Sequence, residues 1–211
     1  MELLQQLLFY LNPEHLVTLI QTFGIWGYLI IFAIIFAESG LLFGFFFPGD
    51  SLLFTAGLFA SQGGFNIYPL AAGCFIAAVA GDSVGYYTGH KFGKKLFRKE
   101  DSLLFHKDHL LKAEKFYEKH GGKTIILARF MPAVRTFAPI VAGIGSMKYS
   151  TFLSYNIFGG LFWAVGMSVA GYFLGTLIPD IDKYLLPIIV FIILASVAPA
   201  AYQIVKEKFS K

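Results

Sequence analysis

The sequence of 211 residues contains few charged side chains. Asp, Glu, Lys and Arg together make up 14% of the chain, whereas 56% of its residues are hydrophobic and its mean hydropathy is +0.65. So small a polar fraction cannot cover the surface of a soluble domain of this length. The chain is therefore predicted to be an integral membrane protein.

Cysteine is almost absent as well. The single one, Cys74, excludes an internal disulfide, and its apolar neighbours favour a small core residue. Two of the five histidines, His106 and His109, are three positions apart, but no further ligand cluster accompanies them, so no metal site is expected. No basic segment precedes the first apolar residues, and no cleavable signal peptide is expected.

Basic residues are missing from the first part of the chain. No lysine or arginine precedes Lys91, ten lie between Lys91 and Lys123, and residues 206–211 carry three more lysines. Basic residues beside membrane segments favour the cytoplasmic side, so residues 91–123 and the C-terminus are predicted to be cytoplasmic. The net charge of +4 thus describes topology and does not favour a nucleic-acid partner.

A long apolar run opens the membrane region. Residues 25–60 would form a helix about 54 Å long, which exceeds the ~30 Å hydrocarbon core, yet the run is too short for two full spans. Pro48 and Gly49 interrupt it. Broken helix at membrane depth is tolerated where it is buried in protein or lines a cavity. We therefore expect a re-entrant hairpin that enters the membrane and turns back.

Residues 124–147 repeat this pattern, with Pro132 and Pro139 as the interruptions. The predicted fold is an all-α polytopic membrane protein with two re-entrant helical hairpins and transmembrane helices. Its parts, in order, are N-terminal helices at the interface or packed on the bundle (1–24), a first repeat (25–90) with a hairpin (25–60) and a span (68–90), a basic loop (91–123), a second repeat (124–178) with a hairpin (124–147) and a span (152–178), and a last span with a basic tail (184–211).

The two halves also share residues. An offset of 86 positions places Ala56-Gly57 on Ala142-Gly143 and the Gly85–Gly89 segment on Gly171–Gly175. Counted from the cytoplasmic loop, the first hairpin enters from outside and the second from inside, which makes the repeat inverted. Inverted repeats whose broken helices meet at the midplane are a transporter architecture, with the binding site between them.

Few charges lie inside the predicted membrane region. Glu38 and Asp50 belong to the first hairpin, Arg129 and Arg135 to the second, and Asp82 to the span between them. A guanidinium at the bilayer centre costs at least ~2.5 kcal/mol, so we expect the hairpin acids Glu38 and Asp50 to meet the two arginines across a wet cavity, with Asp82 as a third acid that could handle protons. Alternatively, these residues are buried ion pairs that only hold the hairpins together, and Asp82 only bonds a neighbouring helix.

Three sets of residues carry a family resemblance. They are Glu38 with Phe47-Pro48-Gly49-Asp50, Gly81-Asp82 with Gly85-Tyr86 and Gly89, and Arg129-Phe130-Met131-Pro132 with Arg135, Pro139 and Ala142-Gly143. Together they resemble the DedA family of membrane proteins, also called the SNARE-associated or VTT domain family, over residues 25–178. The resemblance implies paired re-entrant hairpins, a need for both acids and both arginines, dependence on proton motive force, and transport of lipid phosphates in the bacterial inner membrane. Asp50 stands where many members have Glu.

The predicted function is proton-motive-force-dependent translocation of a lipid phosphate, with undecaprenyl phosphate, the carrier for cell-wall precursors, as the expected lipid. Arg129 and Arg135 would hold the phosphate, because the planar guanidinium binds phosphate oxygens bidentately and stays charged. Glu38, Asp50 and Asp82 would handle the protons. No cofactor is expected, and the oligomeric state, a homo-oligomer included, stays open.

Other functions use only part of this charge set. A proton-coupled exchanger of small ions or drugs would need the acids alone, and a membrane-protein assembly factor would need neither acids nor arginines. An intramembrane aspartyl protease would use Asp50 and Asp82 but not the arginines. A lipid phosphatase would require a histidine nucleophile, and none of the five histidines lies near residues 129–135. An enzyme is therefore not expected.

Overall fold

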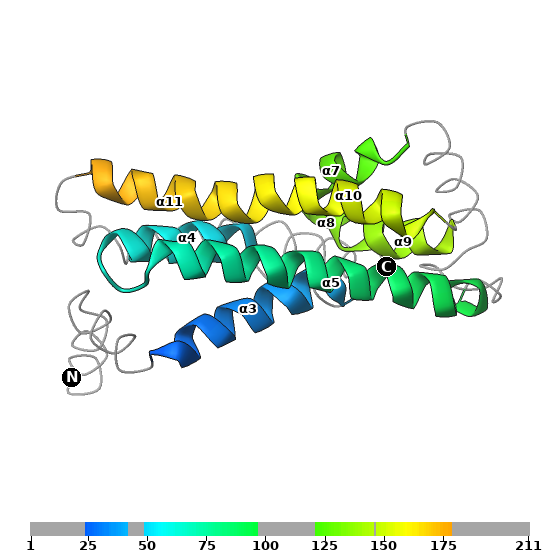
Figure 1. The fold of residues 1–211 in the computed structure, drawn as a ribbon, viewed down its shortest axis with the longest axis horizontal. Coiled ribbons are helices and arrows are strands. Elements are labelled where there is room, and N and C mark those ends of the chain that lie inside the picture. Colours follow the sequence, from blue (N-terminus) through cyan, green and yellow to red (C-terminus); the bar gives the residue numbers. More distant parts are fainter. Residues whose placement is uncertain (1–23, 42–48, 97–120, 146, 179–211) are drawn as a thin grey trace, which may run out of the picture. The chain divides into compact units, whose positions relative to one another are not determined.

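The computed structural model describes residues 24–41, 49–96, 121–145 and 147–178 (Figure 1). Within these ranges every regular element is helical, as predicted. The elements are α3 (Ile25–Gly40), α4 (Gly49–Ser61), α5 (Ile67–Leu96), α7 (Lys123–Arg129), α8 (Pro132–Arg135), α9 (Phe137–Ile144), α10 (Tyr149–Gly160), the π-helix η2 (Leu161–Val165) and α11 (Gly166–Leu177). The expected N-terminal helices, most of the basic loop and the last span lie outside the described residues.

Two helical stretches are long and apolar enough to cross a membrane. They are Ile67–Phe92, with 26 residues, and Tyr149–Leu177, with 29 residues. At a rise of about 1.5 Å per residue, both exceed the ~30 Å thickness of a hydrocarbon core. They coincide closely with the spans predicted at 68–90 and 152–178. The all-helical class is therefore confirmed, and the described part of the chain contains two candidate membrane spans.

Shorter helices occupy the two runs for which hairpins are predicted. α3 and α4 fall in the first run, and α7, α8 and α9 fall in the second. The break between α7 and α8 follows from Pro132, because a residue that precedes proline favours extended backbone, and Met131 has φ −115° and ψ 100°. Pro139 lies in the first turn of α9, where a missing N–H disturbs no helical hydrogen bond.

The chain forms two compact units. The first contains Pro48–Gly73 together with the residues up to Phe32 and those from Gly166 onward. The second contains Ala33–Phe47 and Cys74–Val165. The divisions fall inside α3, inside α5 and where η2 meets α11.

In the first unit, α4 lies beside α11 (Figure 1). A Cβ atom on Gly57 would lie 1.9 Å from the carbonyl oxygen of Ser168, and one on Gly171 would lie 2.0 Å from that of Phe54. Both distances are far below a permitted contact, so only glycine lets these two backbones come so close. Small residues serve the same purpose in membrane helices generally, because apolar side chains gain little there from leaving lipid.

In the second unit, α9 packs on α5 in the same way. A Cβ on Gly143 would lie 2.0 Å from the carbonyl oxygen of Tyr86, and one on Gly89 would lie 2.0 Å from that of Ile140. These two contacts match the two in the first unit. The residues of α9 follow their counterparts in α4 by 86 positions, which is the offset of the predicted repeat. The residues of α11 follow their counterparts in α5 by 82 positions, so these contacts match Gly89 to Gly171 and not to Gly175.

A glycine pair in α11 allows a matched test of this packing. Gly171→Ala should lower the free energy of unfolding by about 1–3 kcal/mol, because the new methyl group forces two backbones apart. Gly166→Ala, in the same helix, has no atom within 4 Å of the new Cβ and should be neutral or stabilising by up to ~1 kcal/mol. Thermal unfolding of the purified protein in detergent measures both. Equal effects of the two substitutions would contradict the close packing.

Candidate functional site

Four of the five predicted charged residues lie in the second unit and are buried. The exposed fractions are 0% for Glu38, 3% for Asp82, 4% for Arg129 and 8% for Arg135. Charged residues are almost never this deeply buried unless they are paired. Their partners therefore define the candidate site.

Both arginines stand at the ends of short helices. Arg129 is the last residue of α7 and Arg135 is the last residue of α8. The break at Met131, caused by Pro132, separates the two helices. It therefore sets the backbone positions from which the two arginine side chains extend. For Arg129 the position is also favourable electrostatically, because the C-terminal end of a helix carries partial negative charge.

Glycines bring the two acids to this unit's core. α3 and α5 approach each other so closely that a Cβ on Gly40 would lie 2.7 Å from the carbonyl oxygen of Gly81. A Cβ on Gly81 would lie 2.6 Å from that of Phe36. Glu38 precedes Gly40 by two residues and Asp82 follows Gly81 directly, so the close approach of the backbones holds both carboxylates near one crossing.

Each arginine pairs with one of these acids. The Nη2 atom of Arg135 donates a hydrogen bond to Oε1 of Glu38. The Nη2 atom of Arg129 lies 2.5 Å from Oδ2 of Asp82. Glu38 has a second oxygen, Oε2, that makes no hydrogen bond within the described part of the chain. Two positive and two negative charges thus balance in a buried cluster.

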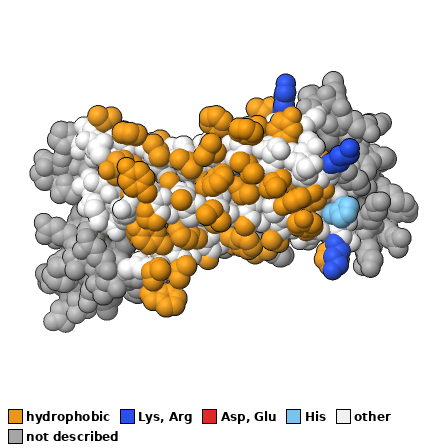
Figure 2. Space-filling view, in the orientation of Figure 1, with side chains coloured by type: hydrophobic (Ala, Val, Ile, Leu, Met, Phe, Trp, Pro, Cys, Tyr) orange, Lys and Arg blue, Asp and Glu red, His pale blue; other side chains and the backbone are white. Residues whose placement is uncertain are grey.

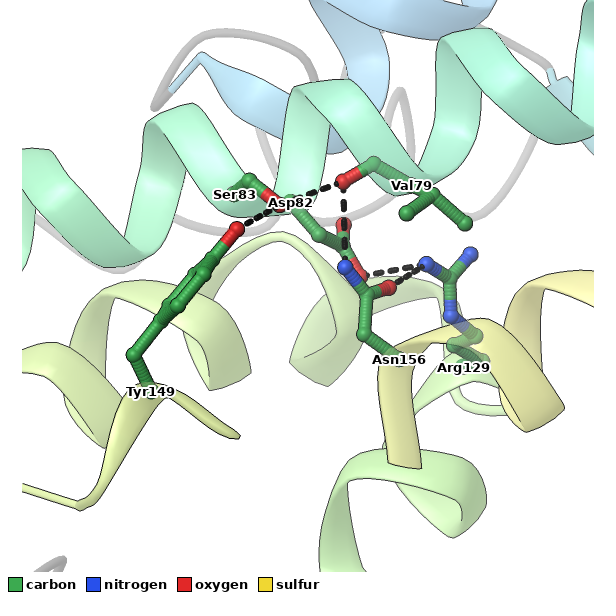
Figure 3. A network of polar contacts seen from close by, with 6 residues as sticks. All are labelled: Val79, Asp82, Ser83, Arg129, Tyr149 and Asn156. Atoms are coloured by element: carbon green, nitrogen blue, oxygen red, sulfur yellow. Dashed lines mark hydrogen bonds and ion pairs between the residues drawn. The ribbon is translucent and has the colours of Figure 1, made fainter. Parts of the chain in front are cut away.

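An asparagine extends the Arg129 pair into a network (Figure 3). Asn156, on α10, accepts a hydrogen bond from Arg129 through its Oδ1 atom and donates one of 3.0 Å to the carbonyl oxygen of Val79. The hydroxyl of Ser83 also donates to that carbonyl, at 2.8 Å, and accepts a bond of 3.3 Å from the hydroxyl of Tyr149. Asn156 therefore ties Arg129 to the backbone of α5.

One aromatic ring lies beside both guanidiniums. The Cζ atom of Arg135 is 4.8 Å from the centroid of the Trp163 ring, and that of Arg129 is 5.7 Å from it. Both distances lie within the ~6 Å that is typical of cation–π contacts. The ring is 2% exposed and belongs to the π-helix η2.

The structure also places most of the remaining predicted residues. Asp50 is in the first turn of α4, next to the buried Gly49, and both belong to the first unit. Pro132 begins α8, and Pro139 is buried in α9. Pro48 lies outside the described residues. The acid that pairs with Arg129 is Asp82, in the predicted span, whereas the sequence pattern placed the hairpin acids Glu38 and Asp50 opposite the arginines.

Asn156 and Trp163 are site residues that the sequence pattern did not indicate. In an apolar span both read as packing or interfacial residues. One signal was available, because a seven-residue spacing puts the two side chains on the same helix face as Gly159. The spacing indicates a site only if a buried charge faces these side chains, and that charge, the guanidinium of Arg129, belongs to another helix.

The arrangement is chemically suited to anions. Two guanidiniums offer donors to phosphate oxygens, and the two carboxylates can release them by taking up protons. Among the described residues no group of three or more metal-ligating side chains is present. The apolar helices are those of an integral membrane protein, and the buried ion pairs form its candidate site.

Comparison with known proteins assigns the family. The VTT domain matches residues 47–173. The chain is 48% identical over 196 residues to Protein DedA of Escherichia coli K12, covering 92% of this chain and 89% of that protein. It is 46% identical over 167 residues to an uncharacterized membrane protein of Mycobacterium leprae, covering 79% and 74%. No solved structure matches the chain significantly. The chain belongs to the DedA family, which confirms the resemblance.

The Glu38–Arg135 pair can be tested by removing one partner and then both. Arg135→Met should lower the free energy of unfolding by about 3–5 kcal/mol, because it leaves a buried carboxylate without its guanidinium. The double variant Glu38→Gln with Arg135→Met should be more stable than the single variant. Thermal unfolding in detergent gives the order of stabilities.

Lys148→Met is the matched control, because it also replaces a cationic side chain by methionine but does so at an exposed position. It should leave stability within about 0.5 kcal/mol of the natural chain. A double variant that is less stable than Arg135→Met would contradict the pairing.

Proposed function

We propose that this protein moves a lipid phosphate across the bacterial cytoplasmic membrane, driven by the proton motive force. The observation that carries the proposal is the pair of buried arginines, each bound by one carboxylate. Arg129 and Arg135 hold the phosphate group, while the hydrocarbon tail stays in lipid. Because only the headgroup must cross, the path can be a groove that opens to the bilayer.

Phosphate and protons exchange for each other at this cluster. When phosphate oxygens bind the two guanidiniums, Glu38 and Asp82 lose their partners. A carboxylate that is buried and unpaired is strongly unfavourable, so each acid takes up a proton. Phosphate binding is thereby coupled to proton uptake, and release of the protons restores the ion pairs. Asp50, in the first unit, is a third acid that serves the proton path.

The helices are arranged as an inverted repeat with two re-entrant hairpins. The contact of α4 with α11 and the contact of α9 with α5 use corresponding glycines, which supports two related halves that exchange partners. α3 has 16 residues and is about 24 Å long, less than the ~30 Å core, and α4, α7 and α9 are shorter still. Helices of these lengths favour hairpins that turn back inside the membrane.

The basic residues orient the protein. Lys91, Lys123 and Lys148 are exposed and lie near the end of α5, at the start of α7 and just before α10. Figure 2 shows basic side chains gathered at one edge of the visible face, with hydrophobic side chains over much of the rest. This distribution favours a cytoplasmic position for residues 91–123, and the lysines of the C-terminus favour the same side.

Undecaprenyl phosphate is the first lipid to test, since the resemblance to the DedA family implies it. Its single phosphate group suits a site that offers two guanidiniums, and its long prenyl tail requires no pocket in the protein. The exchanger and assembly-factor alternatives use no phosphate, so one experiment separates them from this proposal.

Proteoliposomes that carry the protein should move a fluorescent long-chain prenyl phosphate between leaflets, and faster under a pH gradient. Arg135→Ala and Arg129→Ala should each slow this movement at least about tenfold, because a hydrogen bond to a charged group contributes about 1.5–3 kcal/mol. Lys148→Ala removes an exposed cation instead and should keep the natural rate. Dithionite quenching of the label measures the lipid in the outer leaflet over time.

Two results would overturn the proposal. If the natural protein does not move the lipid and yet dissipates a pH gradient in vesicles that contain no prenyl phosphate, that result would indicate an ion exchanger. Full envelope integrity in cells that depend on the Arg129→Ala or Arg135→Ala protein would indicate an assembly role.

A further inference from the structure

Trp163 lies beside two like charges. Its ring lies 4.8 Å from the guanidinium carbon of Arg135 and 5.7 Å from that of Arg129. The two guanidiniums are therefore no farther apart than the sum of these distances. Two cations in the same buried cluster repel each other, and both the carboxylates and the ring can oppose that repulsion.

The ring is fixed by the helix that carries it. Trp163 is the middle residue of the five-residue π-helix Leu161–Val165, and single π-turns inside α-helices occur frequently at functional sites. Asn156 and Gly159 precede it on the same buried face of α10. A Cβ on Gly159 would lie 2.9 Å from Cδ of Arg129, so the missing side chain lets Arg129 lie along this face.

The ring differs from the two carboxylates in one respect. Glu38 and Asp82 bind the arginines as anions, so an arriving phosphate competes with them for the same donors. The face of an indole ring attracts a cation without using up a hydrogen-bond donor, and its attraction does not depend on protonation. The ring can therefore keep hold of both guanidiniums while their partners change.

We infer that Trp163 is a positioning residue that holds Arg129 and Arg135 as a pair for one phosphate group. This role rests on the proposed function. The carboxylates are the exchangeable partners of the arginines, and the indole is a constant partner that the two arginines share. Nothing in the site requires the ring to touch the phosphate.

Two substitutions separate the ring's charge interaction from its bulk. Trp163→Leu should raise the half-saturating concentration of prenyl phosphate about tenfold or more, because both cation–π contacts are lost at a desolvated site. Trp163→Phe keeps an aromatic face and should recover most of that loss. Transport in proteoliposomes measures both, and the maximal rate should change less than the half-saturating concentration.

Ring fluorination gives a sharper test, because fluorine weakens the attraction of the ring for cations while it nearly preserves the ring's shape. The sequence has two tryptophans, so Trp26→Phe leaves Trp163 as the single position to label. Tryptophans with one to four ring fluorines at position 163 should raise the half-saturating concentration stepwise. The same analogues at position 26, exposed in α3, in a Trp163→Phe background are the matched control and should give no trend.

The outcomes separate this role from the function on which it rests. If neither the natural chain nor the Trp26→Phe protein with natural Trp163 moves prenyl phosphate, the proposed function is contradicted, and the role of Trp163 with it. Transport that proceeds but does not respond to fluorination at position 163 would overturn the role of Trp163 alone. A stepwise loss at position 163, absent at position 26, supports it.

Discussion

The need to neutralise two guanidiniums in an apolar interior governs this structure. Arg129 and Arg135 are buried in the second unit, where an isolated charge would be prohibitively costly. Asp82 and Glu38 meet that need, one for each arginine. Removing either partner of such a pair leaves the other charge stranded, so all four residues depend on each other.

The backbone geometry around the cluster follows from this constraint. Gly40 and Gly81 let α3 and α5 approach until their carboxylates reach one crossing, and Gly159 leaves room for the Arg129 side chain against α10. In the second interrupted run, Pro132 interrupts the helix between the two arginines. Glycines and a proline, which would weaken an ordinary helix, here set the positions of charges. The same use of glycine recurs where α4 meets α11 and where α9 meets α5.

Much of the fold was predictable, because membrane thickness limits helix length. The spans at 68–90 and 152–178 correspond to long helices, and the described parts of both interrupted runs form shorter helices. The four buried charges of the site were also predictable, since intramembrane charge is rare and usually functional. The pairing was not. The sequence pattern favoured Asp50 over Asp82 as a partner of the arginines, because Asp50 lies in a predicted hairpin, but the structure pairs Arg129 with Asp82. Composition does not rank two carboxylates on different helices.

The sequence alone therefore determined the membrane class, the family, the positions of the two long apolar helices and which charged residues lie in apolar parts of the chain. These are local properties, set by hydropathy, by proline and glycine positions, and by counts of charge. The tertiary structure decided that Asp82 binds Arg129 and that Glu38 binds Arg135. It also decided that Asn156 and Trp163 belong to the site. Such contacts join residues 27 to 97 positions apart, and only the packing of helices at their glycines brings those side chains together.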